Sequence, residues 1–483
     1  MTNVFAAVDL GASGGRVLTG RITSERLEVA EQARFPNAGI AVGGRLYWDI
    51  LRLWKHILDG LRLAAANGPI RSVGVDGWAV DYGLLDRRGE LLGAPRHYRD
   101  ARNTTGLERL VDLIDPSEHY RRTGTALLPI VTAAQLLAES EERLEHAERL
   151  LMVPDLVVYW LTGRQGTEVT NASTTGLLAA SAERWDDEVV SKVGLDPRLL
   201  APLRQPGENA GNLQPDVAAE LALHRPIQVT VVASHDTASA VAAVPAATDA
   251  FGYVSAGTWS LVGVETHRPV LTESARSARF TNERGVDGTT RLLRNVMGLW
   301  LLQESYRIWQ LQGVVPDLDD LLASAGRLPA LQWTIDVDAP ELLAPGDIPA
   351  RIAALCRAGR SGVPKTPPEM TRCIVDSLAL AHRRALREVQ ALTGLSIEVV
   401  HVVGGGARNG LLCQATADAC GLPVIAGPAE ATAVGNLLVQ ARAADELGDD
   451  LKSLRACVRR SAVLVEYEPG ATEPWDRAHA SLE

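Results

Sequence analysis

Two glycine-tipped hairpin patterns, about 245 residues apart, restrict the fold of this chain more than any other feature. The first covers 4–22, where two apolar segments flank the small-residue tip 11–15. The second covers 253–264 and has its tip at 256–259. A turn rich in small residues between two apolar, partly β-branched segments is typical of a β-hairpin. Because each hairpin opens one half of the chain, the sequence predicts a duplicated, two-lobed protein.

The boundary between the lobes is predicted where the chain passes from 1–244 to 245–483. The Ala/Val-rich stretch 238–247 is expected to cross between them as a helix. In the second half, helices are expected at 376–393 and 411–420, on either side of a strand. Strand patterns that alternate with helical patterns indicate an α/β fold.

Two strand patterns of the first half lead to a carboxylate. The strand 72–76 ends at Asp76, and the strand 228–233 is followed closely by Asp236. Open α/β sheets bind their ligands at the carboxyl ends of the strands, so both side chains are candidates for the chemistry. Asp236 also stands directly before an alanine-rich helical pattern, where it would serve as a helix N-cap. The two roles are compatible.

The charge of the chain limits its partners. It has 483 residues with 48 basic and 59 acidic side chains, and its net charge of -11 has the wrong sign for electrostatic capture of nucleic acid or an anionic membrane. Hydrophobic residues make up 46% of the chain, which suits a folded core and excludes a disordered protein. No apolar run reaches the roughly 18 residues of a membrane-spanning helix. We therefore expect a cytoplasmic monomer or small homo-oligomer that binds small molecules.

Three glycine-containing loops follow strand patterns and suggest phosphate binding. They lie at 11–15, 257–258 and 404–406, where bare backbone N–H groups can converge on anionic oxygens. The chain has no G-x-x-x-x-G-K-[ST] motif, and its four lysines lie outside these loops, which excludes a P-loop enzyme. None of the loops reads G-x-G-x-x-G, so a Rossmann dinucleotide site is not expected. Of these kinds of nucleotide site, the one that the sequence still allows is a site built on hairpin loops.

Several strings of the chain, in order and at compatible spacings, resemble the FGGY carbohydrate kinases and, among these, the rhamnulokinases. They are AVDLGASGGR, GVDGWAVDYGLLD, YRDAR, MVPDLVVYWLTG, ASHDTASAV, SAGTWSLVGVE, NVMGLWLLQE and VVGGGARN. The resemblance extends from the first strand to about residue 440. ASHDTASAV and NVMGLWLLQE single out the rhamnulokinases, whereas the hairpin loops belong to the wider family.

The resemblance implies a fold, an activity and two cofactors. The family has two lobes of ribonuclease-H-like, actin-like α/β fold, with the active site in the cleft between the lobes. Its members transfer a phosphoryl group from ATP to a sugar with the help of Mg²⁺. The rhamnulokinases phosphorylate L-rhamnulose at its 1-hydroxyl in L-rhamnose catabolism, so an ATP-dependent ketose kinase is expected.

The resemblance also implies roles for individual residues. Asp236 matches the catalytic base, which takes the proton from the attacking sugar hydroxyl, and Asp9 matches the carboxylate that holds Mg²⁺ through water. The positions that match sugar contacts are Trp78, Ala79, His235, Asp236, Thr237 and Asn295. Those that match nucleotide contacts are Ala12, Ser13, Gly14, Gly15, Arg16, Thr258, Gln303, Gly404 and Gly405. Arg16 is the one cation in a phosphate loop, where a guanidinium would bind the terminal phosphate.

The identity of the sugar stays open because of one departure. Where the family commonly has Trp-Gly, this chain has Trp78-Ala79, and the additional β-carbon would narrow the sugar pocket. Trp78 would either stack on a sugar face or fill the core. Another ketose, such as L-fuculose or the pentulose xylulose, is the first alternative substrate. A non-metabolic actin-like ATPase is a further alternative, although it has no need of a sugar-facing pair such as His235-Asp236.

Cysteine usage argues against a disulfide scaffold. Five cysteines in 483 residues are few, and none forms a C-x-x-C pair. Cys413 and Cys420 would lie about 10 Å apart on one helix, beyond disulfide reach. Cys356 and Cys373 are the pair open to bridging, and proteins of the rhamnulokinase kind carry a cysteine pair at this spacing.

Overall fold

The structure is a computed structural model that describes residues 4–23, 25–223, 225–314, 317–359 and 362–480. The chain separates into two compact units. The first contains the residues up to Ala247 together with Glu265–Leu292 and Ala431–Ser461, and the second contains Thr248–Val264, Leu293–Glu430 and the residues from Ala462 on. Two segments of the second half of the chain thus take part in the first unit.

The first unit is built on a six-stranded sheet with the strand order β11-β12-β6-β1-β2-β3. The strands are β1 (Val4–Gly11), β2 (Gly14–Thr23), β3 (Arg26–Pro36), β6 (Ile70–Gly77), β11 (Asn209–Asn212) and β12 (Gln228–Thr230). β1 is antiparallel to β2 and parallel to β6. Because β1 and β6 are parallel neighbours, their carboxyl ends meet at one edge of the sheet, where Asp9 and Asp76 are register partners.

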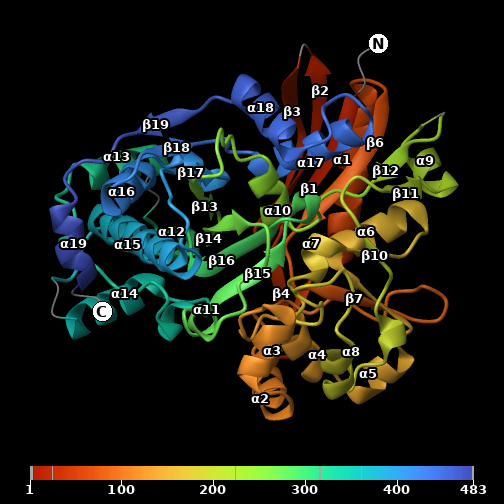
Figure 1. Cartoon of the computed structure of the whole chain (residues 1–483), viewed down its shortest axis with the longest axis horizontal. Coiled ribbons are helices and arrows are strands. Elements are labelled where there is room, and N and C mark those ends of the chain that lie inside the picture. Colours follow the sequence, from red (N-terminus) through yellow and green to blue (C-terminus); the bar gives the residue numbers. More distant parts are fainter. Residues whose placement is uncertain (1–3, 24, 224, 315–316, 360–361, 481–483) are drawn as a thin grey trace. The chain divides into compact units, whose positions relative to one another are not determined.

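Both faces of this sheet are covered by helices. These are α1 (Ile50–Ala66), α6 (Val153–Thr162), α10 (Asp236–Ala242) and α17 (Ala431–Ala443). Ala6, Val8 and Leu10 of β1 belong to one buried cluster with α1 and α6. The side chains of a strand alternate between its faces, and α17 packs on the opposite face of β1 and β6, next to α10 (Figure 1). The parallel central strands β1 and β6 are therefore buried on both sides.

α1 shows how the sequence encodes this packing. Ile50, Leu53, Ile57 and Leu61 are buried and recur at helical spacing, so they form one apolar face. Asp49 caps the helix, because its side chain accepts a hydrogen bond from the backbone N–H of Arg52 at 3.2 Å.

A buried polar network fastens α17 to the sheet. Asn436 donates to Oδ2 of Asp76 at 2.6 Å, and Gln440 donates to the backbone oxygen of Ala6 at 3.0 Å. The hydroxyl of Ser72 donates to Gln440 at 2.6 Å. Buried polar groups that lose such partners are costly, so these bonds fix where α17 lies along β1 and β6.

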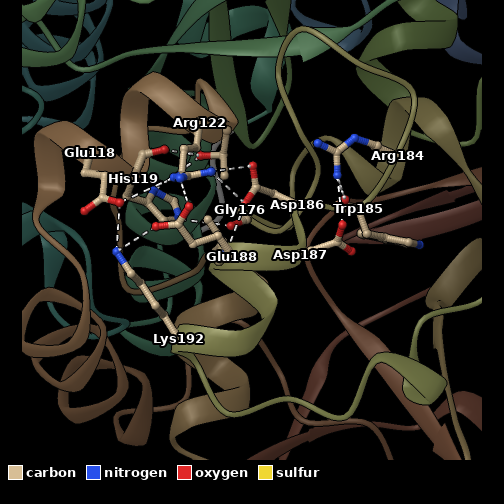
Figure 2. Close-up of polar contacts among 12 residues, drawn as sticks. Glu118, His119, Arg122, Gly176, Arg184, Trp185, Asp186, Asp187, Glu188 and Lys192 are labelled. Atoms are coloured by element: carbon tan, nitrogen blue, oxygen red, sulfur yellow. Dashed lines mark hydrogen bonds and ion pairs between the residues drawn. The ribbon is translucent and has the colours of Figure 1, made fainter.

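A second part of the first unit surrounds α3 (Pro116–Thr123) and α8 (Asp187–Lys192), which ion pairs join (Figure 2). Arg122 lies 3.4 Å from Asp186 and also pairs with Glu188. Lys192 lies 2.8 Å from Glu118 and 3.3 Å from Glu188. Asp186 is also the N-cap of α8 and accepts from the backbone N–H of Val189. Charge and capping therefore place α8 against α3.

The first unit contains further α-helices and strands. They are β4 (Gly39–Val42), β5 (Arg45–Trp48), β7 (Tyr82–Leu85), α2 (Arg102–Leu113), α4 (Thr132–Leu137), α5 (Glu141–His146), β8 (Arg149–Met152), β9 (Thr167–Glu168), α7 (Val169–Ala172), β10 (Leu203–Arg204), α9 (Pro215–Glu220), α11 (Glu273–Ser277), β15 (Phe280–Arg284) and α18 (Leu451–Ser461).

The sheet of the second unit repeats the pairing of the first. In it β16, β14, β13, β17, β18 and β19 follow in that order. The strands are β13 (Phe251–Ala256), β14 (Trp259–Thr266), β16 (Thr290–Met297), β17 (Val399–Val403), β18 (Val424–Ala426) and β19 (Val465–Tyr467), of which 265–266 and 290–292 belong to the first unit. β13 is antiparallel to β14 and parallel to β17, just as β1 is to β2 and β6. The predicted duplication is confirmed.

The helices of the second unit include α15 (Pro367–Thr393), which packs beside α16 (Gly410–Cys420) (Figure 1). α15 begins earlier than the predicted residue 376, since its prolines fall in the first turn, where a missing N–H costs nothing. Thr366 and Glu369 form a capping box there. The other helices of this unit are α12 (Trp300–Leu311), α13 (Leu318–Gly326), α14 (Ile348–Ala358) and α19 (Glu473–Ala480).

Two expected elements of the first half are shorter than predicted. The strand predicted at 228–233 ends at Thr230, and the helix predicted at 238–247 ends at Ala242. Pro245 explains the second difference, because a residue that precedes proline is disfavoured in the helical conformation.

The five cysteines are thiols in this structure. The sulfur atoms of Cys356 and Cys373 lie 3.9 Å apart in the core of the second unit. Cys413 and Cys420 lie on α16, as predicted.

None of the described helices is both long and apolar enough to span a membrane.

Candidate active site

The first predicted phosphate loop is the tip of the β1–β2 hairpin. Ala12-Ser13 forms its turn, because Gly11 and Gly14 are the last register partners of the two strands. A β-carbon on Gly15 would lie 2.1 Å from a ring carbon of Phe35, so this position has room for glycine alone. The loop therefore presents backbone N–H groups with few side chains in front of them, which suits an anionic ligand.

Three ionisable side chains, those of Asp9, Arg16 and Asp76, meet where β1, β2 and β6 come together. Arg16 donates to Oδ2 of Asp9 at 2.5 Å. Asp76 is fully buried, and burial together with the neighbouring Asp9 raises its pKa well above the ordinary value, against the hydrogen bond from Asn436. Its Oδ1 has no hydrogen-bond partner among the described residues. The sheet edge thus holds an ion pair beside a carboxyl group whose protonated form is favoured.

Asp236 is the first residue of α10. Its Oδ1 accepts from the backbone N–H of Thr237 at 2.5 Å and from the Thr237 hydroxyl at 3.1 Å. The prediction that Asp236 caps this helix is wrong, since His235 occupies the N-cap. A capping residue must lie outside the helix and accept from an N–H two or three residues ahead, whereas Asp236 is already helical. Its side chain keeps 30% of its surface exposed, so a ligand can reach it.

The charge of Asp236 depends on its surroundings. Desolvation by the surrounding protein raises the pKa of its carboxyl, His235 lowers it, and the negative charge of Asp9 raises it further. A carboxylate whose pKa lies above the ordinary range is a stronger base than a free aspartate.

Buried Glu168 holds the segment that carries Asp236. Its carboxylate accepts from the backbone N–H of Ser234 at 2.9 Å and from the Ser234 hydroxyl at 3.0 Å. The backbone N–H of Thr170 also donates to Glu168 at 2.9 Å, and the Thr170 hydroxyl accepts from the backbone N–H of His235 at 3.2 Å. These bonds anchor the segment between β12 and α10.

Trp78 and Ala79 follow β6 at the carboxyl end of the sheet. Trp78 is 4% exposed, its ring centroid lies 4.3 Å from that of Trp48, and its indole N–H donates to Asp81 at 3.1 Å. The structure therefore supports the core-filling role of Trp78, and a contact of this ring with a sugar stays a prediction. Ala79 is half-buried and precedes Val80, whose φ of 67° is rare for a β-branched residue.

The second predicted phosphate loop joins β13 to β14. Thr258 lies at its turn, which the N–H of Gly257 closes by donating to the backbone oxygen of Trp259 at 2.8 Å. The N–H of Trp300, at the start of α12, donates to the backbone oxygen of Thr258 at 3.2 Å. A β-carbon on Gly298 would lie 2.5 Å from the backbone of Trp259, so glycine permits this close approach.

The remaining predicted residues of the second unit lie on β16, on α12 and after β17. Gly404 has a φ of 81°, and Gly405 has open space where a β-carbon would be. Both belong to a loop that packs against Ala256, the last residue of β13. Gln303 is exposed on α12, and Asn295 is half-buried on β16.

Comparison with known protein families agrees with this duplicated arrangement. The N-terminal domain of the FGGY family of carbohydrate kinases matches residues 4–243, and its C-terminal domain matches residues 252–444. This chain belongs to the FGGY family of carbohydrate kinases. It is 41% identical over 483 residues to a rhamnulokinase from Bacteroides thetaiotaomicron, covering 99% of this chain and 98% of that one. It is 38% identical over 467 residues to a rhamnulokinase from Bacillus subtilis, covering 96% and 95%.

Solved structures of sugar kinases share the fold of this FGGY kinase. A gluconate kinase from Lactobacillus acidophilus has a TM-score of 0.82 at 16% identity, covering 100% of this chain and 97% of that one. Glycerol kinase from Plasmodium falciparum with ADP has a TM-score of 0.79 at 14% identity, covering 99% and 97%. The predicted two-lobed, actin-like α/β fold is confirmed.

The predicted site residues of this FGGY kinase fall into two groups. The first unit contains Asp9, Ala12, Ser13, Gly14, Gly15, Arg16, Trp78, Ala79, His235, Asp236 and Thr237. The second unit contains Thr258, Asn295, Gln303, Gly404 and Gly405. Their assigned roles stay predictions.

The sequence interpretation missed three residues beside the proposed base. Glu168 holds the Ser234–His235 backbone, and Glu283 and Arg291 contact the His235 ring. The one available signal was the placement of Arg291 in an apolar strand pattern, since a buried arginine needs an acidic partner.

Proposed function

We propose that this FGGY kinase phosphorylates L-rhamnulose at its 1-hydroxyl, with ATP as donor, to give L-rhamnulose 1-phosphate and ADP. The observation that carries the proposal is the partly exposed carboxylate of Asp236, which stands beside His235 at the carboxyl end of the central sheet. The rhamnulokinases to which the chain is similar over nearly its whole length support this choice of sugar.

Asp236 would act as the general base. It would accept the proton of the sugar hydroxyl while that oxygen attacks the terminal phosphorus of ATP, and the bond to the bridging oxygen of ADP would break. The raised pKa of its carboxyl favours proton uptake. Thr237 fixes Oδ1 of Asp236 through two hydrogen bonds, which keeps the carboxylate in one orientation.

The hairpin tip would bind the transferred phosphate. The backbone N–H groups of 12–16 and the guanidinium of Arg16 would stabilise the charge that develops on the phosphoryl oxygens. Asp9 fits the role of holding hydrated Mg²⁺, since Mg²⁺ prefers a few carboxylates together with phosphate oxygens and water. When bound, Mg²⁺ would neutralise part of the phosphate charge.

The second unit would contribute the other contacts. We assign Thr258, Gln303, Gly404 and Gly405 to the nucleotide, because the loops that carry Thr258 and Gly405 offer backbone groups at strand ends. We assign Asn295, with Trp78, Ala79, His235 and Thr237, to the sugar. We further propose that the enzyme works in the cytoplasm, where ATP is available, as a monomer or small homo-oligomer.

A panel of ketoses tests the proposed function. ADP release would be measured with L-rhamnulose, L-fuculose and D-xylulose, with and without Mg²⁺, and the phosphorylated carbon would be located by ³¹P–¹H NMR. The proposal requires the highest kcat/KM with L-rhamnulose, a 1-phosphate product and dependence on Mg²⁺. ADP release that no ketose stimulates would overturn it.

A kinase for another ketose is the second candidate, and Ala79 is the observation that favours it. Ala79 is half-buried and follows the carboxyl end of β6, where its methyl group would narrow the predicted sugar pocket. Ala79→Gly tests this directly. If the methyl group excludes L-rhamnulose, the variant gains kcat/KM for that sugar relative to the pentulose; an unchanged ratio means that Ala79 does not select the sugar.

A further inference from the structure

A buried glutamate and a buried arginine contact the imidazole of His235 on the side away from Asp236. Nδ1 of His235 lies 3.1 Å from Nη2 of Arg291 and 3.2 Å from Oε2 of Glu283. Nε2 of the same ring lies 3.3 Å from Oδ1 of Asp236. His235 and Glu283 are each 5% exposed and Arg291 is 0% exposed. The four side chains form a continuous chain of polar contacts that ends at the proposed base.

The chemistry of arginine decides which ring nitrogen carries the proton. A guanidinium can only donate, so a hydrogen bond between Arg291 and Nδ1 requires a lone pair on Nδ1. The neutral ring then carries its proton on Nε2, the nitrogen that faces Asp236. Nη2 of Arg291 also lies 3.0 Å from Oε2 of Glu283, so the guanidinium forms an ion pair with the carboxylate while it donates to the ring. Oε2 of Glu283 accepts no hydrogen bond among the described residues.

Glu283 holds Arg291 in this position. Burial alone would raise the pKa of Glu283, but Arg291 and His235 outweigh burial, and the pKa is below its ordinary value. The carboxylate therefore stays ionised and compensates the charge of the buried guanidinium. Nε of Arg291 donates to the backbone oxygen of Arg284 at 3.0 Å, and this hydrogen bond fixes the plane of the Arg291 guanidinium group.

Without Arg291, the same geometry would favour the opposite tautomer. Glu283 would then be the one charged neighbour of Nδ1, and a carboxylate attracts a proton to the nitrogen it faces. Nε2 would then turn a lone pair toward the carboxylate of Asp236, which is repulsive. The corresponding contact of the Nδ1 lone pair with Glu283 in the native protein is offset by the guanidinium of Arg291.

We propose that Arg291 and Glu283 are positioning residues that hold His235 as its Nε2–H tautomer, so that the ring donates toward Asp236 and keeps the base correctly oriented. The inference rests on the proposed function in one respect, the role of Asp236 as the base. The positions of the protons on His235 can be measured without any reaction.

The test uses the full chain with ¹⁵N-labelled histidine at about pH 8, above the ordinary imidazole pKa of about 6.5. His235→Asn assigns the His235 signals. We expect the parent protein to show its proton on Nε2, and Arg291→Met to move it to Nδ1 and lower kcat by about 10- to 100-fold with a smaller change in KM.

A double variant keeps the inference testable if Arg291→Met fails to fold because Glu283 is left unpaired. In Arg291→Met/Glu283→Gln, the side-chain amide at position 283 can donate a hydrogen bond to Nδ1 of His235, so the Nε2–H tautomer should return. We expect kcat of this double variant to be at least tenfold higher than that of Arg291→Met. If Arg291→Met does not fold, kcat of the double variant should lie within tenfold of the parent. Recovery of kcat alone would also follow from removing the unpaired charge of Glu283. The deciding readout is therefore the return of the proton to Nε2 of His235, which a purely structural ion pair does not predict.

Arg442→Met is the matched control. It removes an ion pair of the same unit, in which Nη1 of Arg442 lies 2.8 Å from Oδ1 of Asp287, and it leaves the contacts of His235 in place. It should leave the tautomer and kcat unchanged. An Nε2 proton that persists in Arg291→Met, or an Nδ1 proton in the parent, overturns the inference even if the parent is a fully active ketose kinase. A parent protein that phosphorylates no ketose overturns the proposed function and leaves the tautomer result standing.

Discussion

Asp236→Asn separates ligand binding from proton transfer. Asparagine keeps an oxygen that can accept from the Thr237 N–H and hydroxyl, which Asp236 now accepts at 2.5 and 3.1 Å, so the local geometry should survive. It cannot take up a proton, and we expect kcat to fall by about 10² to 10⁴, with nearly unchanged Kd for ketose and nucleotide. Steady-state kinetics and calorimetric titration measure the two effects.

Asp216→Asn serves as the control, since Asp216 is an exposed acid in the first turn of α9 in the same unit. It should behave like the parent. If Asp236→Asn turns over within tenfold of the parent, Asp236 is not the base.

Asp81 makes stability depend on pH in an unusual direction. Burial raises the pKa of its carboxyl to about 7, although the indole N–H of Trp48 and the amide of Gln135 donate to it. Because the folded-state pKa lies above the unfolded value, the contribution of Asp81 to stability is fully present below about pH 4 and is lost as the pH rises through 7. Relative to the parent, Asp81→Asn should therefore become more stable by on the order of 4 kcal/mol between pH 4 and pH 8.

Urea unfolding at several pH values measures this difference. Asp86→Asn is a control for which we expect the opposite pH dependence. Hydrogen bonds, the strongest of them from the backbone N–H of Glu90, lower the pKa of Asp86. Its native carboxylate contributes stability that is lost as the pH falls. A pH-independent difference for Asp81→Asn would contradict the raised pKa.

At the scale of elements, the ion pairs of Figure 2 should matter for how α8 docks on α3. Arg122 contacts three acids, one of which, Asp186, has only 8% of its side chain exposed. Arg122→Ala should lower the free energy of unfolding by about 1 kcal/mol, which is near the upper end of what surface ion pairs contribute to stability.

Arg184→Ala is the matched control in the same view (Figure 2). Arg184 is 62% exposed and pairs with an acid, Asp187, that is 91% exposed, so its loss should cost less than about 0.5 kcal/mol. Thermal or urea unfolding compares the two variants. Equal effects would mean that the network adds nothing beyond an exposed pair.

For the whole molecule, the first unit should not fold from the first half of the chain alone. A fragment of residues 1–244 lacks α17, and with it Asn436 and Gln440, the partners of buried Asp76 and Ser72. It would expose one apolar face of β1 and β6 and leave these polar groups unpaired. We expect a fragment without cooperative unfolding or sharp amide NMR signals.

A synthetic peptide of residues 431–461 should restore part of the structure when it is added to this fragment, since it supplies α17 and α18. A peptide of the same composition in scrambled order is the control. Cooperative unfolding of the fragment without any peptide would show that the first half is an independent domain.

The sequence alone determined the features that depend on near neighbours in the chain. Both hairpins, the strand that leads to Asp76 and the helix α16 follow from glycine tips and apolar periodicity, and all appear as predicted. The strings around Asp9, Asp236 and Gly404 carried the family resemblance for the same reason, because each site segment is short and continuous.

The tertiary structure decided what depends on partners distant in the chain. Arg291 reaches His235 across 56 positions, and Asn436 reaches Asp76 across 360, so no local pattern could pair them. Two local predictions also failed: β12 ends at Thr230 rather than at 233, and Asp236 lies inside the helix that it was expected to cap. Sequence periodicity reports which face of an element is buried, but the partner on that face is chosen by packing and by the need of buried polar groups for hydrogen bonds.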